Sequence, residues 1–335
     1  MDSSTPSSTP LSDAPQALPQ LPGPKLAPFT PTAHADIEFI EQLGNPAEDM
    51  DSFVWKVRIN GMAPYYALKM FQFNAALYLE SSIGSYLNRP LASPQLWIDY
   101  FDPFRCECRA YGRLKEECRE DIAVRAHGYL FLTPEQELEV AKRSTPIQPD
   151  DAENDDPWGR AEEPLVADRP VHAIVKDLAT DNNHFTRDQI DHLWRDLEDF
   201  HKLGILVRDV TVSNYIGGKL IDLSRAWTVP HPSLEYIHER YLRQQRRRDP
   251  VCLQNCIIDV GIDDGWNLDE VDMKELDACA IGEGENDGYG IDPRRYDWRK
   301  WEDHRTLEAT EAFLEHEIYA PPPPEDPEAE GDEEE

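Results

Sequence analysis

The sequence contains no apolar run of about 18 residues, the length that a membrane-spanning helix requires. Its first thirty residues also lack the basic start and the apolar centre of a secretory signal. We therefore expect a soluble, intracellular protein that makes no membrane contact.

Basic residues are scarce relative to acidic ones. The 335 residues include 33 Lys and Arg against 66 Asp and Glu, which gives a formal net charge of −33. Binding to nucleic-acid phosphates relies on clustered Lys and Arg, so this balance argues against direct nucleic-acid binding. Basic protein partners, such as histone-like tails, are compatible with the charge.

Cysteine is also sparse, and its six positions match no common zinc-ligand spacing. The close pairs Cys106/Cys108 and Cys252/Cys256 could each supply half of a metal site. Reduced structural thiols are the alternative that an intracellular setting favours.

Both ends of the chain are poor in the periodic apolar residues that a core requires. Residues 1–35 are dominated by Pro, Ser and Thr, and residues 320–335 form a polyproline spacer followed by an acidic block. Such segments cannot offset the entropy of ordering their backbone. We predict that both ends are disordered and that residues 36–319 form the folded part.

Alternating apolar residues predict three strands near the start of the folded part, in "DIEFIEQLG", "SFVWKVRI" and "PYYALKMFQF". The third strand follows the turn signal Asn60-Gly61. Residues 74–103 give no clear pattern, and "DPFRCECRAYGRLKEEC" then predicts a helix capped by Asp102. "AVRAHGYLFLT" and "PVHAIVKDL" predict two more strands, separated by an acidic insert at 134–169 that we expect to be a loop.

The second half of the chain has mainly helical patterns. "TRDQIDHLWRDLEDFHKLGI" has one continuous apolar face and a stop signal at Gly204. Short strands follow on either side of the turn Gly217-Gly218. "HPSLEYIHERYLRQQRRR", which we expect to end near Asp249-Pro250, and the segment after Pro293 predict further helices. The basic run at 240–248 fits a nuclear-import signal, a phosphate contact or the solvated face of a helix.

Four side chains, in their order along the chain, have the chemistry that phosphoryl transfer requires. The reaction needs a cation on the nucleotide phosphates, carboxylate and amide oxygens on Mg²⁺, and a carboxylate beside the attacking hydroxyl. Residues of these types are Lys69, Asp209, Asn214 and Asp222. Each of them alone is more often an ordinary surface or turn residue, so the prediction depends on the ordered set.

The ordered set resembles the protein-kinase-like fold. "YALK" is similar to the lysine strand of that fold, "RDVTVSN" to its catalytic loop and "LIDLS" to its metal-binding segment. The resemblance implies an α+β, two-lobed protein that uses ATP and Mg²⁺. The strand-rich N-terminal lobe and hinge would span 36–177, and the helical C-terminal lobe would span 178–319.

The same resemblance implies a role for each residue of the site. Glu107, with Glu116 or Glu117 as alternatives, would pair with the lysine, and 174–177 would form the interlobe hinge. The catalytic residues implied are Asp209, Lys69, Glu107 and Asn214. The metal ligands implied are Asn214 and Asp222, and the nucleotide contacts are Gly44, Lys69, Val175 and Lys176.

The sequence departs from the kinase pattern where a Gly-rich loop should cover the phosphates. "LGNPAEDMDSFVWKV" keeps only Gly44 and adds acidic residues. Val207, Thr211 and Ser224 replace residues that peptide kinases usually have, and no Ala-Pro-Glu segment follows. "LIDLSRAW" is closer to small-molecule kinases of the aminoglycoside and choline type. Two hypotheses stay open: an atypical phosphotransferase, or a pseudokinase that serves as a binding module.

A second resemblance covers most of the folded part. "FRCECRAYGRLKE", "AVRAHGYLFL", "HKLGILVRDVTVSNYIGGKLIDLSRAWTVPHP" and "YDWRKWED" are similar to the fungal kinetochore Sim4-complex subunit family of the Fta-two type. This resemblance implies a kinase-like protein of filamentous fungi with protein partners, kinetochore subunits among them. A kinetochore role and the basic run both favour a nuclear location.

Overall fold

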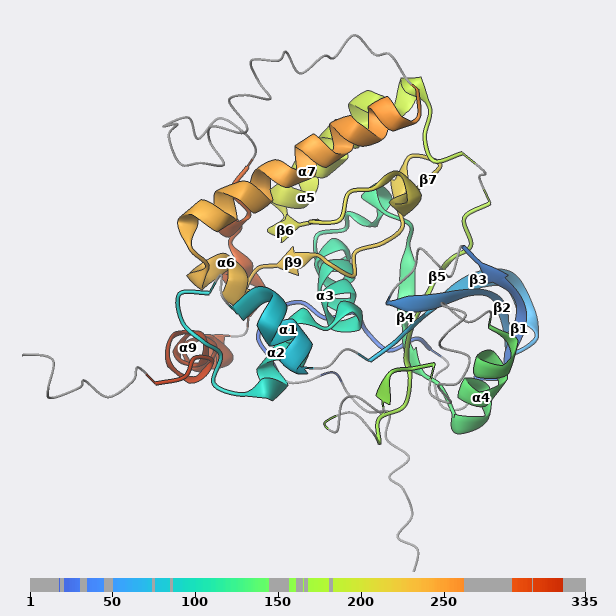
Figure 1. Ribbon diagram of the computed structural model, residues 1–335, viewed down its shortest axis with the longest axis horizontal. Coiled ribbons are helices and arrows are strands. Elements are labelled where there is room, and N and C mark those ends of the chain that lie inside the picture. The colour runs from blue at the N-terminus through green and yellow to red at the C-terminus, as the bar shows by residue number, and fades with distance from the viewer. Residues whose placement is uncertain are drawn as a thin grey trace, which may run out of the picture.

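The computed structural model describes residues 18, 21–30, 35–44, 51–73, 76–84, 87–144, 157–160, 165, 168–180, 183–261, 291–302 and 304–321. A strand-rich N-terminal lobe and a mainly helical C-terminal lobe lie on either side of helix α3 (Pro103–Glu116), as Figure 1 shows. This arrangement confirms the α+β, two-lobed class that the sequence predicts. No helix in these residues is long and apolar enough to cross a membrane.

The N-terminal lobe is built on a five-stranded antiparallel sheet in the order β1-β2-β3-β5-β4. Its strands are β1 (Ile37–Leu43), β2 (Ser52–Ile59), β3 (Met62–Phe71), β4 (Ala126–Phe131) and β5 (His172–Asp177). All five were predicted from the sequence. The alternation has the expected result: Leu68 and Val175 face the lobe core, whereas Lys69 and Lys176 face the other side of the sheet.

Residues 21–30 correct the prediction that residues 1–35 are disordered. Leu26 and Phe29 are buried, and their backbone amides donate to carbonyls of α3 and β4 over 2.9 and 2.7 Å. A Cβ at Gly112 would lie 2.5 Å from the backbone of this arm, so the glycine permits the close approach. The Pro-rich composition of this segment led to the prediction of disorder, although Leu26 and Phe29 attach it to the folded part.

Helices α1 (Ala76–Ile83) and α2 (Pro94–Phe101) fill the segment that the sequence left unassigned. They precede α3 in the chain but pack on the C-terminal lobe. The backbone amides of Asn88 and Ala92 donate to Tyr236 O at 2.7 Å and Ile318 O at 2.9 Å. Helix α3 begins as predicted, because Asp102 accepts a hydrogen bond from the Arg105 amide at 3.3 Å.

The acidic insert was predicted to be a loop, and this is wrong for its first part. Residues Pro134–Arg143 form helix α4, which opens with a capping box between Thr133 and Gln136. Val140 anchors the helix in the core of the N-terminal lobe. The acidic composition outweighed this start signal in the sequence-based prediction, and residues 145–156 lie outside the described part of the chain.

The C-terminal lobe contains the long helices α5 (Ile190–Lys202) and α7 (Glu239–Asp259), which run side by side in Figure 1. Gly204 has a φ of +73° and ends α5 as predicted. The described residues of this lobe also form the strands β6 (Ile205–Leu206), β7 (Tyr215–Ile216), β8 (Lys219–Leu220) and β9 (Trp227–Thr228), the helices α6 (Pro232–Tyr236) and α9 (His304–Ala312), and short 3-10 and π turns.

Helix α7 does not end at Asp249-Pro250 as predicted, but continues to Asp259. Buried Leu253 and Ile257 pack into the main core and carry the helix past the proline. The basic run 240–248 is therefore not a uniform solvated face, because several of its side chains are buried. The acidic segment 262–290 and the tail 322–335 lie outside the described residues.

The cysteines that the structure describes are free thiols: Cys106, Cys108, Cys118, Cys252 and Cys256. Cys279 lies outside the described residues. Within the described part, no group of three or more His, Cys, Asp or Glu side chains is arranged to hold a metal ion.

Candidate functional site

Lys69, on β3, lies at the centre of a buried cluster of charges. Its Nζ atom is 3.0 Å from Glu107 Oε2 on α3 and 2.6 Å from Asp222 Oδ1, which follows β8. The side chains of Lys69 and Glu107 are 5% and 0% exposed, so water screens their attraction weakly. The structure thus brings three of the predicted residues together.

Glu107 is the only one of the three candidate glutamates that reaches Lys69. Glu116 instead pairs with Arg113 at 3.1 Å, and Glu117 with Lys300 at 2.6 Å. Glu107 thus faces Lys69 on the sheet, whereas Glu117, just after the end of α3, contacts Lys300 in the C-terminal segment.

Lys176, on β5, adds a second buried cation to the cluster. Its ammonium contacts the other carboxylate oxygen of Glu107 and donates to Ile221 O at 2.7 Å. Two lysines and two carboxylates therefore form a locally balanced group. Because β5 alternates, the neighbouring Val175 side chain lies in the core of the N-terminal lobe and does not line the cleft.

The charge cluster fixes the protonation of its members. Burial works to raise the pKa of the Asp222 carboxyl, but Lys69, Lys176 and the hydrogen bond from the Ser224 amide hold that pKa well below its usual range. For Lys69, burial lowers the pKa, while Asp222 and Glu107 raise it, with a net increase. Both side chains therefore stay charged at neutral pH.

A cavity of about 340 Å³, here called the first cavity, opens beside this cluster between the lobes. Its polar end is formed by Lys69, Asn214 and Asp222. The rest of its wall is largely apolar, with Leu43, Val54, Ala67, Val124, Leu178, Ala179, Ile216 and Ile221. Such a cavity suits a ligand with a flat apolar part and a charged end.

The predicted hinge, 174–177, and the predicted nucleotide contact Gly44 can both be placed relative to the first cavity. Strand β5 pairs with β3 as far as Asp177, so the connection between the lobes begins later than the predicted 174–177. Gly44, at the end of β1, lines the cavity and has a φ of +76°. Lys176 also lines the cavity, although its ammonium is held by Glu107.

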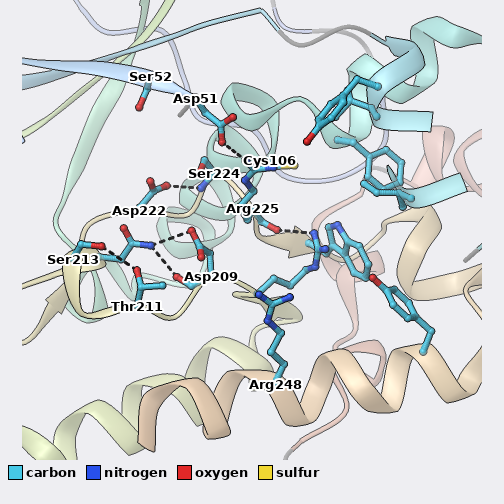
Figure 2. Close-up of a pocket in the computed structure, with 18 residues that line it drawn as sticks. Asp51, Ser52, Cys106, Asp209, Thr211, Ser213, Asp222, Ser224, Arg225 and Arg248 are labelled. Atoms are coloured by element: carbon cyan, nitrogen blue, oxygen red, sulfur yellow. Dashed lines mark hydrogen bonds and ion pairs between the residues drawn. The ribbon is translucent and has the colours of Figure 1, made fainter. Parts of the chain in front are cut away.

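Asp209 and Asn214 lie on the loop between β6 and β7, on the C-terminal side of the cleft. Asn214 Nδ2 donates to Asp209 O at 2.9 Å and to Asp209 Oδ2 at 3.2 Å. Since the amide nitrogen faces Asp209, the amide oxygen is left for another contact. Figure 2 shows the carboxylates of Asp209 and Asp222 facing the same space.

Asp249 holds this loop, and the sequence reasoning missed its role. The fully buried carboxylate accepts the backbone amides of Val207 at 2.9 Å and Arg208 at 2.8 Å. His201 Nε2 donates to it at 3.0 Å. These bonds support a strained backbone, since Arg208 has a φ of +69°. The signal in the sequence that could have pointed to this role is Asp249 itself, an acidic residue that precedes Pro250 within a helical pattern.

A second ion pair that the sequence reasoning missed crosses the cleft. Asp51, just before β2, contacts Arg225 at 2.5 Å, as Figure 2 shows. Burial raises the pKa of the Asp51 carboxyl, whereas Arg225 and Lys69 oppose that rise. This carboxylate lies in the segment that should cover the nucleotide phosphates by resemblance to kinases.

Helix α3 is bonded to the C-terminal lobe and to the N-terminal arm. Arg113 donates to the carbonyls of Leu203 at 3.3 Å and Val229 at 2.9 Å. Arg109 donates to Pro22 O at 2.8 Å in the N-terminal arm, and also to Pro230 O. The position of Glu107 is therefore fixed by the C-terminal lobe as well as by the sheet.

Residues 14–227 match the family model described as "Kinetochore Sim4 complex subunit FTA2". No curated protein matches the chain. Among solved structures, "Structure of vaccinia related kinase 3" matches with 13% sequence identity and a TM-score of 0.37, over 92% of this chain and 88% of that chain. The kinase-like fold is supported by the strand order and the Lys69–Glu107 pair.

Proposed function

The chain belongs to the kinetochore Sim4 complex subunit FTA2 family, and from that premise we propose that it is a kinase-like kinetochore subunit that transfers a phosphoryl group from ATP. The observation that carries this proposal is the position of Lys69 between Glu107 and Asp222 at 3.0 and 2.6 Å. A buried lysine held by two carboxylates at the polar end of a cavity is suited to contact the phosphates of a nucleotide.

In this proposal the first cavity holds the nucleotide. The base lies among the apolar side chains, Val54, Ala67 and Ile221 among them. The phosphates extend toward the ammonium of Lys69. Glu107 keeps that ammonium in place, because α3 is bonded to both lobes.

Asn214 and Asp222 are the residues that would hold Mg²⁺. The amide nitrogen of Asn214 is engaged by Asp209, which leaves its oxygen for the ion. Asp222 Oδ1 accepts from Ser224 and contacts Lys69, which leaves Oδ2. Both are hard oxygen donors of the kind that Mg²⁺ prefers. The ion would neutralise charge on the transferring phosphoryl group.

Asp209 is the residue that would accept the proton of the attacking hydroxyl group. Asn214 donates to its carboxylate and to its backbone carbonyl, which fixes the side chain at the edge of the cleft. Asp249 also holds the loop, because its carboxylate accepts the backbone amides of Val207 and Arg208, which come just before Asp209. A positioned carboxylate within reach of the acceptor is what general base catalysis requires.

One observation favours the alternative function, a pseudokinase that serves as a binding module. The Asp51–Arg225 pair places a carboxylate on the phosphate side of the cleft, and Gly44 is the only glycine kept in that loop. In that alternative the Lys69 cluster is a structural link between the sheet, α3 and the loop after β8.

Formation of ADP separates the two functions. The purified chain is incubated with ATP, Mg²⁺ and a panel of hydroxyl compounds, and ADP is measured. Asp209→Asn is expected to reduce ADP formation by about 100-fold or more, since the base is lost, while ATP affinity is retained. Wild-type rates in this variant would contradict the assigned base, and the absence of ADP from the wild-type protein would support the binding module.

Membership of the family supports protein partners within a kinetochore assembly and a nuclear location. Tagging the protein in its native cells tests this part of the proposal. We expect the signal to coincide with a centromere marker and kinetochore subunits to copurify with the tag. A signal spread through the cytoplasm, without such subunits, would contradict it.

A further inference from the structure

A second cavity, of about 500 Å³, lies beside the first cavity on the other side of Asp222 and Asn214. Both cavities are lined by these two residues and by Ser52 and Ser213. Figure 2 shows that Asp209 faces the second cavity. A ligand there would lie next to the proposed base, and a nucleotide in the first cavity would reach it past Asp222.

The carboxylates in the wall of the second cavity all have partners in the protein. Asp51 pairs with Arg225, Asp222 pairs with Lys69, and Asp209 accepts from Asn214. These acidic groups therefore do not by themselves make the second cavity a cation site.

Two guanidinium groups, those of Arg208 and Arg248, line the same wall. No carboxylate of the described residues lies within ion-pair distance of Arg208 or Arg248. Arg208 stacks 3.7 Å from the Trp227 ring centroid and donates to Gln245 Oε1 at 3.3 Å. Arg248 is exposed, extends from α7 toward the cavity in Figure 2, and bonds to the thiol of Cys252. Burial lowers the pKa of Arg208 to about 10, which leaves this guanidinium charged at neutral pH.

The second cavity is also lined by apolar and aromatic side chains. They are Tyr78, Leu79 and Ile83 from α1, Phe101 from α2, and Trp227 and Tyr241 from the C-terminal lobe. The segment between α1 and α2 is bonded to the C-terminal lobe through Asn88 and Ala92. A volume of about 500 Å³ is typical of small-molecule pockets, so the cavity suits a small molecule better than an extended peptide.

We infer that the second cavity binds a small molecule that has an apolar body and an anionic group, a carboxylate or a phosphate. Arg248 and Arg208 hold the anion, and the apolar and aromatic side chains hold the body. The further statement that this molecule is the phosphate acceptor rests on the proposed function. In that reaction its hydroxyl oxygen forms a bond to the terminal phosphorus of ATP, the bond from that phosphorus to the bridging oxygen breaks, ADP leaves, and the hydroxyl proton passes to Asp209.

Two phenyl compounds of similar size and opposite charge test the inference: the anion phenyl phosphate and the cation phenyltrimethylammonium. Each is titrated into the full chain and binding is measured by calorimetry. We expect phenyl phosphate to bind in the millimolar range or tighter, and the cation to bind at least about tenfold more weakly, the difference of one charge-assisted contact. Equal affinities, tighter binding of the cation, or no binding of either probe would overturn the inference.

A pair of variants locates the binding. Arg248→Gln should weaken phenyl phosphate binding by about tenfold or more, because it removes a guanidinium from the cavity wall. Arg243→Gln is the matched control: it removes the same charge from α7, but Arg243 is exposed and pairs with Glu239 outside the cavity. Equal effects of the two variants would show that only net charge matters and would overturn the site.

A separate titration with ATP and Mg²⁺ distinguishes failure of this inference from failure of the proposed function. Phenyl phosphate binding that depends on Arg248, in a chain that binds no ATP, would leave the anion site standing and remove the proposed transfer reaction. ATP binding without a preference for phenyl phosphate over the cation would overturn the anion site and leave the nucleotide site of the proposed function standing.

Discussion

The two sides of Lys69 are built differently. On the α3 side, its ammonium meets Glu107, whose side chain is 0% exposed and also holds Lys176. On the phosphate side, Lys69 contacts Asp222, whose side chain is 21% exposed, and a further ion pair joins Asp51 and Arg225, whose side chains are 17% and 43% exposed. The α3 side is a buried framework, whereas the phosphate side is closed by a contact that water screens and a ligand can displace.

The largest effect is expected from breaking the α3 side. Glu107→Ala leaves two buried lysines with one fewer carboxylate, so we expect a loss of about 3–5 kcal/mol in the free energy of unfolding, measured by urea denaturation. Lys115→Ala is the control on the same helix. Its pair with Glu120 is partly exposed on both sides, and its loss should cost about 1 kcal/mol or less. Similar losses in both variants would remove the distinction between the two sides.

The N-terminal arm is a further support of the α3 side. Gly112→Ala would place a Cβ 2.5 Å from the backbone of Lys25, so the arm must shift. We expect a loss of roughly 1–3 kcal/mol and faster proteolysis within the arm. Gly84→Ala serves as the control, because its nearest neighbour would be 3.5 Å away. An unchanged cleavage rate in Gly112→Ala would show that the arm does not depend on this approach.

The cap of α3 should make stability depend on pH. Burial raises the pKa of the Asp102 carboxyl to about 7, against 3.8 for the ordinary side chain. The folded state therefore binds the Asp102 proton more tightly than the unfolded state does. The resulting stabilisation of the folded state is fully present below pH 3.8 and is lost as the pH rises through 7. Asp102→Asn, which can still cap the helix, should gain about 2 kcal/mol relative to wild type between pH 5 and 8. A difference independent of pH, from denaturant titrations, would contradict this.

A substitution on the phosphate side should give the smallest change in stability. Its main effect should be on the affinity for ATP. Asp51→Asn breaks a partly exposed pair, so its cost should stay under about 1 kcal/mol. Removal of the carboxylate should raise the affinity for ATP with Mg²⁺ several-fold, measured by calorimetry. Asp36→Asn, at the start of β1, is the control with the same charge change. Weaker ATP binding in Asp51→Asn would mean that this carboxylate helps the nucleotide bind.

Local sequence patterns predicted those site residues whose placement depends on residues close to them in the chain. Alternation along β3 places Lys69 on the cleft side of the sheet, and helical spacing places Glu107 on α3. The loop with Asp209 and Asn214 and the segment with Asp222 follow in the expected order. Their positions in space follow from elements that the sequence identifies well.

The remainder depends on contacts between residues far apart in the chain. Asn88 bonds to Tyr236, and this contact makes α1 and α2 part of the C-terminal lobe. Leu26 and Phe29 are buried by α3 and β4, although their segment has the composition of a disordered tail. No local period indicates such partners, so the second cavity and the arm could not be predicted from the sequence.

The most direct test of the proposed site is a calorimetric titration of the full chain with ATP, with and without Mg²⁺, beside Asp222→Ala. Circular dichroism confirms that the variant is folded. The arrangement of Lys69, Asn214 and Asp222 predicts micromolar binding that requires Mg²⁺ and is lost in the variant. The absence of binding at millimolar ATP, or equal binding by the variant, would contradict it.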